Sequence, residues 1–253
     1  MKRFFSFGCS FTHYIWPTWA NILGKQYDYY ENWGHMGAGN FYILNSLVEC
    51  HLKNQITRDD VIGIMWTNIH RIDTYKNEKW IVSGNVHSDI KSFEQFKPFI
   101  DTRGFYIRDL SFIYLAEQLL ENIGCKYFMS SMIDIRNFFQ SNINIEDSFE
   151  KIDDILPYYK NTLDKINPSM HQVIFNYDWD SRPFRSTRAQ ARLDNHPTPA
   201  EHLEYLDKIF PEYLISSETR EFIKEIDNKL RIGDNIENLL VKYDFKKTPP
   251  KRW

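Results

Sequence analysis

The chain has 253 residues, of which 42% are hydrophobic and 26% charged, so it is long enough for one large core, and we expect one domain rather than two. A net charge of -3 argues against a protein whose main role is to bind nucleic acid. The odd cysteine count, without a CxxC pair, argues against a disulfide framework or a zinc ribbon. No stretch approaches the roughly 20 apolar residues of a membrane span, so we expect a soluble, cytoplasmic protein.

Four short segments, rich in aromatic or β-branched residues and bounded by turn formers, predict strands at 3–7, 27–33, 60–66 and 125–130. Segment 170–176 is expected to add a fifth. Helices are predicted between the strands from apolar residues at helical spacing: Phe41, Leu44, Val48, His51 and Leu52 in 40–54, and Tyr106, Leu110, Ile113 and Leu120, with Glu117, in 106–123. This alternation predicts an α/β fold with a mostly parallel, five-stranded sheet and helices on both faces.

The alternation of strands and helices is interrupted between residues 69 and 104, where 80–82 and 84–86 suggest a hairpin or an ordered insertion that could cover a site. Segment 149–166 predicts a helix with Pro157 as a kink or break, and 178–197 predicts a long loop. Helices are expected at 200–210, 218–231 and 235–243. We therefore expect one domain over 1–245, with a helical C-terminal part, followed by a basic tail over 246–253.

The first predicted strand ends in Gly8-Cys9-Ser10, which places a serine just beyond the strand. In an open α/β sheet, ligands bind outside the carboxyl ends of the strands. A serine hydroxyl is a poor nucleophile at neutral pH and needs a base, together with donors for the oxyanion that forms. A serine after a glycine is by itself more often a turn residue, so the later segments decide its meaning.

Three later segments offer those partners. Gly37 follows the second predicted strand and could present an N–H to a cleft, and Asn68 follows the third strand with a side-chain amide. His196 precedes a predicted helix, where its imidazole could reach back over the sheet. Each has a plainer interpretation: Gly37 as a turn residue, Asn68 as a turn or cap, and His196 as a surface residue at a helix start.

In this order the four segments resemble the blocks of the SGNH (GDSL-like) hydrolase family. Gly8-Cys9-Ser10 is similar to the family's Gly-Asp-Ser, the stretch from Asn32 to Gly37 to its Asn-x-Gly-x-x-Gly, Asn68 to the asparagine of its Gly-x-Asn, and His196-Pro197 to its histidine-proline. The resemblance implies a three-layer α/β/α sandwich with a flavodoxin-like sheet. It also implies Ser10 as nucleophile, His196 as base, and the Ser10 and Gly37 amides with the Asn68 side chain as the oxyanion hole.

The chain departs from the family pattern at three positions. Cys9 replaces the aspartate of the first block, and Trp66 stands where the third block usually has glycine. The family's acid lies three residues before the histidine, where this chain has Leu193. Asp194 is one candidate to orient the imidazole; Asp178, Asp180 or a backbone carbonyl are the alternatives.

The resemblance implies a serine esterase or acyl hydrolase that needs no cofactor and acts on acetylated carbohydrates or other small oxygen esters. The same site could pass the acyl group to a sugar hydroxyl, as an acyltransferase. A domain with weakened catalysis that serves carbohydrate binding or assembly is the alternative of another class. The sequence leaves the substrate and the oligomeric state open.

An anionic substrate is suggested by a cluster of arginines before His196, because guanidinium groups pair well with phosphate or carboxylate. The expected substrate-binding residues are Arg185, Arg188 and Arg192, with Arg182 in the same run and His13 beyond Ser10. Such a run is more often a solvated loop. A metal site made by His196, His202 and Glu201 with His13, His35 or His70 fits no standard zinc spacing, so we expect none.

Overall fold

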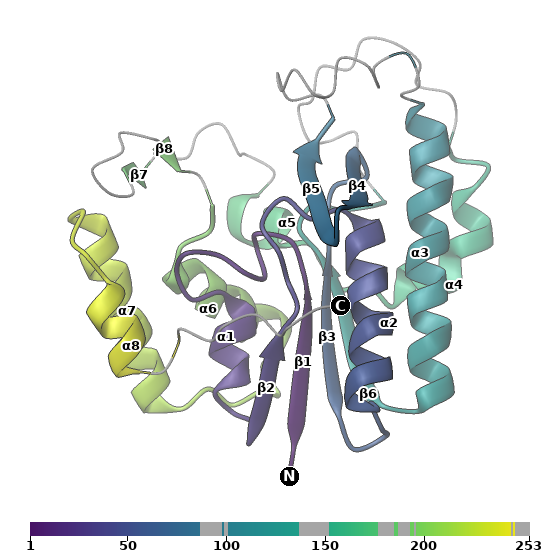
Figure 1. The fold of residues 1–253 in the computed structure, drawn as a ribbon. Coiled ribbons are helices and arrows are strands. Elements are labelled where there is room, and N and C mark those ends of the chain that lie inside the picture. Colours follow the sequence, from purple (N-terminus) through teal and green to yellow (C-terminus); the bar gives the residue numbers. More distant parts are fainter. Residues whose placement is uncertain are drawn as a thin grey trace.

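The computed structural model describes residues 1–86, 98, 101–136, 152–176, 185–186, 193–194, 196–243 and 245. Its centre is a sheet of four parallel strands in the order β2-β1-β3-β6 (Figure 1). They are β1 (Arg3–Gly8), β2 (Tyr29–Asn32), β3 (Val61–Trp66) and β6 (Lys126–Ser131). The four expected segments are thus strands, and the mixed α/β class with a parallel sheet is confirmed.

Helices lie on both faces of this sheet (Figure 1). One face carries α2 (Asn40–Asn54), α3 (Thr102–Ile123) and α4 (Lys160–Asp164), and the other carries α1 (Trp19–Gly24), α6 (Pro199–Ile209) and α7 (Ser217–Arg231). Side chains alternate along β1, so that Phe5 and Phe7 are buried with α2 and α3 whereas Phe4 is buried with α1. Two cores result, one on each side of the sheet.

The expected fifth strand at 170–176 is wrong. These residues form α5 (Met170–Phe175), and the Ser169 hydroxyl accepts a hydrogen bond of 3.1 Å from the Gln172 amide at its start. On the side of β6 away from β3, the described residues contribute one parallel bridge, from Ile166 to Met129. A short apolar run does not distinguish a strand from a buried helix, and here the serine cap favours the helix.

Helix α2 spans the predicted residues, but the apolar series chosen from the sequence does not lie on its buried side. Phe41, Val48 and Leu52 are 40%, 39% and 62% exposed, whereas Ile43 and Leu47 are fully buried. The buried side was hard to recognise because it also carries polar residues whose side chains have partners. These are Asn40, Ser46 and Glu49. In α3 the predicted series Tyr106, Leu110, Ile113, Glu117 and Leu120 is buried.

The insertion contains a hairpin of β4 (Arg71–Lys76) and β5 (Lys79–Asn85), which lies beyond the carboxyl ends of the strands (Figure 1). Both residues of its turn, Asn77 and Glu78, have positive φ angles of 53° and 60°, as a two-residue hairpin turn of the primed type requires. A hairpin was expected here, but both predicted arms, 80–82 and 84–86, lie on its second half. The partner strand was missed.

The later helices follow the predictions closely. The expected ranges 200–210 and 218–231 correspond to α6 and α7, and 235–243 contains α8 (Glu237–Lys242). In 149–166 the described residues form a 3-10 helix, η3 (Leu156–Tyr159), and α4, and Pro157 stands in the first turn of η3 instead of kinking a longer helix. No helix in the described part of the chain is long and apolar enough to cross a membrane.

Gly63, at the centre of β3, gives a test of this packing. A Cβ at this position would lie 2.6 Å from Phe128 Cζ and 3.0 Å from the Trp19 ring, both in the core with α1. We expect Gly63→Ala to lower the free energy of unfolding by about 1–3 kcal/mol, because the rings must be displaced. Urea unfolding measures it, and an unchanged midpoint would contradict this description of the core.

Candidate functional site

Ser10 lies on a tight turn directly after β1. The Cys9 carbonyl accepts hydrogen bonds from the Thr12 and His13 amides, at 2.9 and 3.0 Å, which bends the chain sharply beyond the strand. At Gly8 an added Cβ would lie 2.0 Å from Thr12 Oγ1 and 2.9 Å from the Met65 carbonyl oxygen, so a side chain cannot fit there without a shift. The glycine before Cys9 is therefore a steric requirement of the turn that carries Ser10.

His196 reaches the same turn from the other end of the chain. Its Nε2 lies 2.9 Å from Ser10 Oγ, a hydrogen bond between residues 186 positions apart. The adjacent Pro197 carbonyl accepts a hydrogen bond of 2.8 Å from Trp16 Nε1, which ties the histidine segment to the segment after β1. The Thr198 hydroxyl then caps α6. No local sequence signal points to the contact with Trp16.

Aromatic rings surround the imidazole. The Tyr14 ring stacks on it with a centroid separation of 4.2 Å and an interplanar angle of 19°, and Phe11 meets it edge-on at 5.7 Å. His202, one turn into α6, is buried and meets Phe11 in the same edge-on manner. The stacked rings restrict the orientation of the imidazole, and the electron-rich face of Tyr14 favours a positive charge on it.

The segment 34–39, which we call the glycine loop, continues from β2 alongside β1. The His35 amide donates to the Gly8 carbonyl at 3.0 Å, and Asn32 Nδ2 donates to the Thr12 carbonyl at 2.7 Å. Asn32 thereby links the glycine loop to the turn that carries Ser10. Gly37 has a φ of +81°, a conformation that other residues rarely adopt.

Asn68 follows β3 and is 5% exposed. Its Oδ1 accepts a hydrogen bond of 2.7 Å from the His70 amide, which turns the Nδ2 donor to the opposite side of the side-chain amide. The preceding Thr67 amide donates to Asn40 Oδ1 at 2.9 Å, so the end of β3 is joined to the start of α2. The position of Asn68 is therefore fixed by its own hydrogen bond to His70 and by the bond of the preceding Thr67 to Asn40.

Three donors at this edge of the sheet have no hydrogen-bond acceptor among the described residues: the backbone N–H groups of Ser10 and Gly37, and Asn68 Nδ2. They come from the ends of β1, β2 and β3, which are neighbours in the sheet. A set of donors without protein acceptors at one edge of the sheet is suited to receive an oxygen atom of a ligand.

The expected acid and arginines lie mostly outside the described residues. Asp178, Asp180, Arg182, Arg188 and Arg192 are not among them. The backbones of β7 (Arg185–Ser186) and β8 (Leu193–Asp194) form a small antiparallel pair in which Asp194 is opposite Arg185. The expected long loop at 178–197 did not include this pair.

His13 is partly exposed, and its pKa lies below the usual value because burial and the neighbouring His35 both disfavour its positive charge. A lowered pKa makes His13 a weak ligand for an anion near neutral pH. In the part of the chain that the structure describes, no three His, Cys, Asp or Glu side chains are grouped closely enough to hold a metal ion.

No protein-family model and no curated protein sequence matches this chain. Among solved structures, a protein of Bacteroides fragilis described as a candidate acylhydrolase is 14% identical, over 88% of each chain, with a TM-score of 0.45. A similarity of this size supports no inference about the activity of this protein.

A second polar cluster, missed from the sequence, lies beside the glycine loop. Asp109 of α3, 1% exposed, accepts hydrogen bonds from Asn40 Nδ2 at 2.7 Å and from Arg108 Nε at 2.6 Å. Burial raises the pKa of Asp109 to about 6, although Arg108 and Asn40 oppose the rise. The negative charge of Asp73, on β4, raises the pKa of Asp109 further. Only the tertiary contacts reveal this cluster, because Asn40, Asp73 and the adjacent pair Arg108-Asp109 are more than 30 residues apart in sequence.

The raised pKa of Asp109 predicts a pH dependence of stability. Between pH 3.8, the ordinary value, and about 6, the folded chain binds more protons at this carboxyl than the unfolded chain does. Its contribution to the free energy of unfolding therefore falls as pH rises through this window. Urea unfolding of the native protein and of Asp109→Asn should show their difference changing between pH 4 and 6.5. A difference independent of pH would contradict the prediction.

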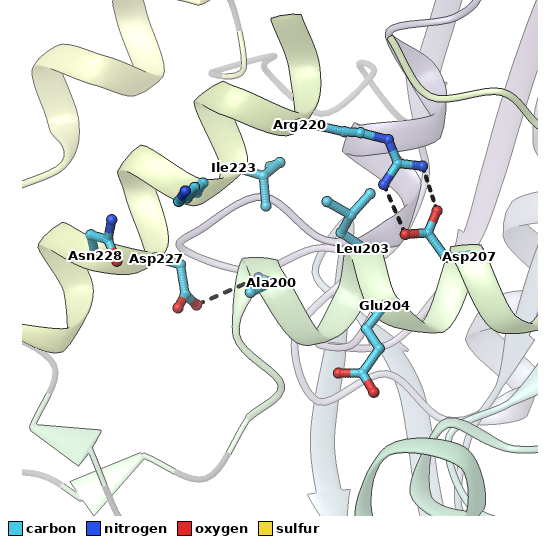
Figure 2. Close-up of a pocket in the computed structure, with 9 residues that line it drawn as sticks. Ala200, Leu203, Glu204, Asp207, Arg220, Ile223, Asp227 and Asn228 are labelled. Carbon is cyan, nitrogen blue, oxygen red and sulfur yellow. Dashed lines mark hydrogen bonds and ion pairs between the residues drawn. The ribbon is translucent and has the colours of Figure 1, made fainter. Parts of the chain in front are cut away.

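A groove of about 250 Å³ lies between α6 and α7 (Figure 2). It is lined by Leu203, Ile223 and several charged side chains, among which Arg220 and Asp207 form a two-pronged ion pair at 2.6 and 2.8 Å. The groove contains none of the candidate site residues. The Arg220 guanidinium in this groove is already paired with the Asp207 carboxylate.

Proposed function

We propose that this protein is a serine-dependent acyl-ester hydrolase of the SGNH type, with Ser10 as nucleophile and His196 as general base. The single observation that carries the proposal is the 2.9 Å contact between Ser10 Oγ and His196 Nε2. A serine hydroxyl within hydrogen-bond reach of an imidazole, at the carboxyl edge of a parallel sheet, is the arrangement that nucleophilic catalysis needs.

In the proposed reaction, Ser10 Oγ attacks the ester carbonyl while its proton passes to His196 Nε2. The carbonyl oxygen becomes an oxyanion, which accepts hydrogen bonds from the Ser10 and Gly37 amides and from Asn68 Nδ2. The tetrahedral intermediate collapses, the alkoxide leaves with the proton from His196, and an acyl group stays on Ser10. Water then attacks this acyl-enzyme with His196 as base, which releases the acid and restores the serine.

The positive charge on His196 during these steps is favoured by the stacked Tyr14 ring. We further propose that Asp194 orients the imidazole, and that Arg185, Arg188 and Arg192 bind an anionic part of the substrate, with neutral His13 as a hydrogen-bond donor beside them. The substrate class we propose is an acetylated carbohydrate or another small oxygen ester, and the reaction as written requires no cofactor.

The experiment is stopped-flow hydrolysis of p-nitrophenyl acetate by the native protein and by Ser10→Ala. We expect a burst of nitrophenol, equal to one equivalent of protein, followed by slower turnover, because acylation and deacylation are separate steps. Adding a sugar acceptor tests the transferase alternative, since the acyl group would then appear on the acceptor. Absence of both burst and turnover in the folded native protein would favour the carbohydrate-binding alternative.

A further inference from the structure

The hairpin β4–β5 contacts the glycine loop at three points, although the two are more than 30 residues apart in sequence. Arg71 Nη1 donates to the Ala38 carbonyl at 2.9 Å. The Asp73 carboxylate accepts from the Gly39 amide at 2.8 Å and from the Tyr42 amide at 2.9 Å. The Val82 carbonyl oxygen lies 3.1 Å from where a Cβ on Gly37 would stand.

Asp73 occupies the position of a helix cap that the local sequence lacks. Helix α2 begins after Gly39, which has no side chain to accept from its first amides, and Asp73 accepts from two N–H groups there instead. The carboxylate is 8% exposed, and negative charge at a helix N-terminus is favourable. Removing it would leave two donors unpaired at the end of the glycine loop.

Arg71 contacts the glycine loop at Ala38. Its Nη2 is directed at the thioether of Met132, at 3.9 Å, and no carboxylate of the described residues forms an ion pair with it. A thioether is a weak acceptor. The hydrogen bond to the Ala38 carbonyl, next to Gly37, is therefore the strong contact of this guanidinium.

We propose that Arg71 and Asp73 are positioning residues, which hold the glycine loop in the conformation that directs the Gly37 amide into the oxyanion hole. This inference rests on the function proposed above and deepens it, because it makes the insertion a part of the catalytic apparatus. A glycine with a positive φ is free to adopt other conformations, and oxyanion donors act only when they are placed in advance. The hairpin supplies that placement.

The test compares Arg71→Ala, Arg71→Lys and Asp73→Asn with Arg103→Ala, a control at the start of α3 whose guanidinium pairs with the exposed Asp154. The probes are p-nitrophenyl acetate for kcat and KM, and an alkyl boronic acid, whose serine adduct places an oxygen in the oxyanion hole. For Arg71→Ala and Asp73→Asn we expect kcat and boronate affinity to fall by the same factor, about 10- to 100-fold, which is less than the loss of a whole donor. KM should change less than about three-fold, since the ground state is not affected.

Arg71→Lys, which keeps one donor and the charge, should recover part of the loss. A purely structural role would lower the unfolding midpoint and leave kcat per folded molecule at the level of Arg103→Ala, and that result would overturn the inference. A rise in KM with an equal fall in kcat/KM, and with kcat unchanged, would also overturn the inference.

A failure of the proposed function is recognised separately. If the native protein forms no boronate adduct and hydrolyses no ester, the proposed function is wrong. Amide hydrogen exchange then tests whether the hairpin holds the glycine loop. Exchange at Gly39 and Tyr42 should be slow in the native protein and at least about ten-fold faster in Asp73→Asn, because their shared acceptor is weakened. Equal exchange in both proteins would overturn the inference about the loop.

Discussion

His196→Ala is expected to lower kcat/KM for ester hydrolysis by about 10⁴- to 10⁶-fold, the loss typical of removing one member of a nucleophile-base pair. The reason is geometric. Nε2 of His196 lies 2.9 Å from Ser10 Oγ, so it accepts the proton as the carbonyl is attacked, and without it the hydroxyl stays protonated. Steady-state hydrolysis of p-nitrophenyl acetate measures the change.

His51→Ala is the matched control for this loss. His51 lies near the end of α2, which begins at the carboxyl edge of the sheet and ends at the opposite edge, so its imidazole is remote from Ser10. The control should keep nearly native activity. A loss of less than about ten-fold in His196→Ala, with its fold retained, would show that another group accepts the proton.

Asn68→Ala is expected to lower kcat by about 100- to 1000-fold, equivalent to about 2.7–4 kcal/mol of transition-state stabilisation. Asn68 Nδ2 is a donor without an acceptor in the described residues, and its Oδ1 is fixed by the His70 amide. The donor therefore meets the oxyanion already oriented. KM should stay within about three-fold, because the ground-state carbonyl gains little from this donor.

Asn68→Asp separates the donor from the local structure. It keeps an oxygen to accept from the His70 amide but replaces the Nδ2 donor with a second oxygen. Its loss of kcat should be at least as large as that of Asn68→Ala. Asn45→Ala removes an exposed amide from α2 and is the control. If Asn68→Asp kept native kcat, the side chain would have no part in the oxyanion hole.

The sheet was predictable because its strands are local patterns. Each is a short run rich in aromatic or β-branched residues and ended by glycine or a polar turn; β1, β3 and most of β6 are buried, and β2 is half-buried. Segment 170–176 has a similar composition, and the capping hydroxyl of Ser169 alone distinguishes it as a helix. In α2 the buried face was misjudged because it carries polar residues: Ser46 and Glu49 have partners one turn away in the same helix, and Asn40 has a distant partner in Asp109.

The features of the site likewise fall into local ones, which the sequence predicts, and long-range ones, which it does not. The turn that carries Ser10 depends on neighbouring residues, and a glycine at position 37 permits a positive φ, so a sequence motif points to both. The residues that hold the site in place act over long separations: Trp16 contacts Pro197 across 181 positions, and Asp73 contacts Gly39 across 34. No local spacing encodes such contacts, and they were absent from the predictions.

Intact-mass analysis after treatment with a fluorophosphonate tests the central claim most directly, because the reagent reacts far faster with an activated serine than with an ordinary hydroxyl. The native protein should gain the mass of one adduct. Ser10→Ala should gain none, and His196→Ala should react far more slowly. Absence of an adduct on the folded native protein, or an adduct that persists in Ser10→Ala, would contradict the account of Ser10 as the nucleophile.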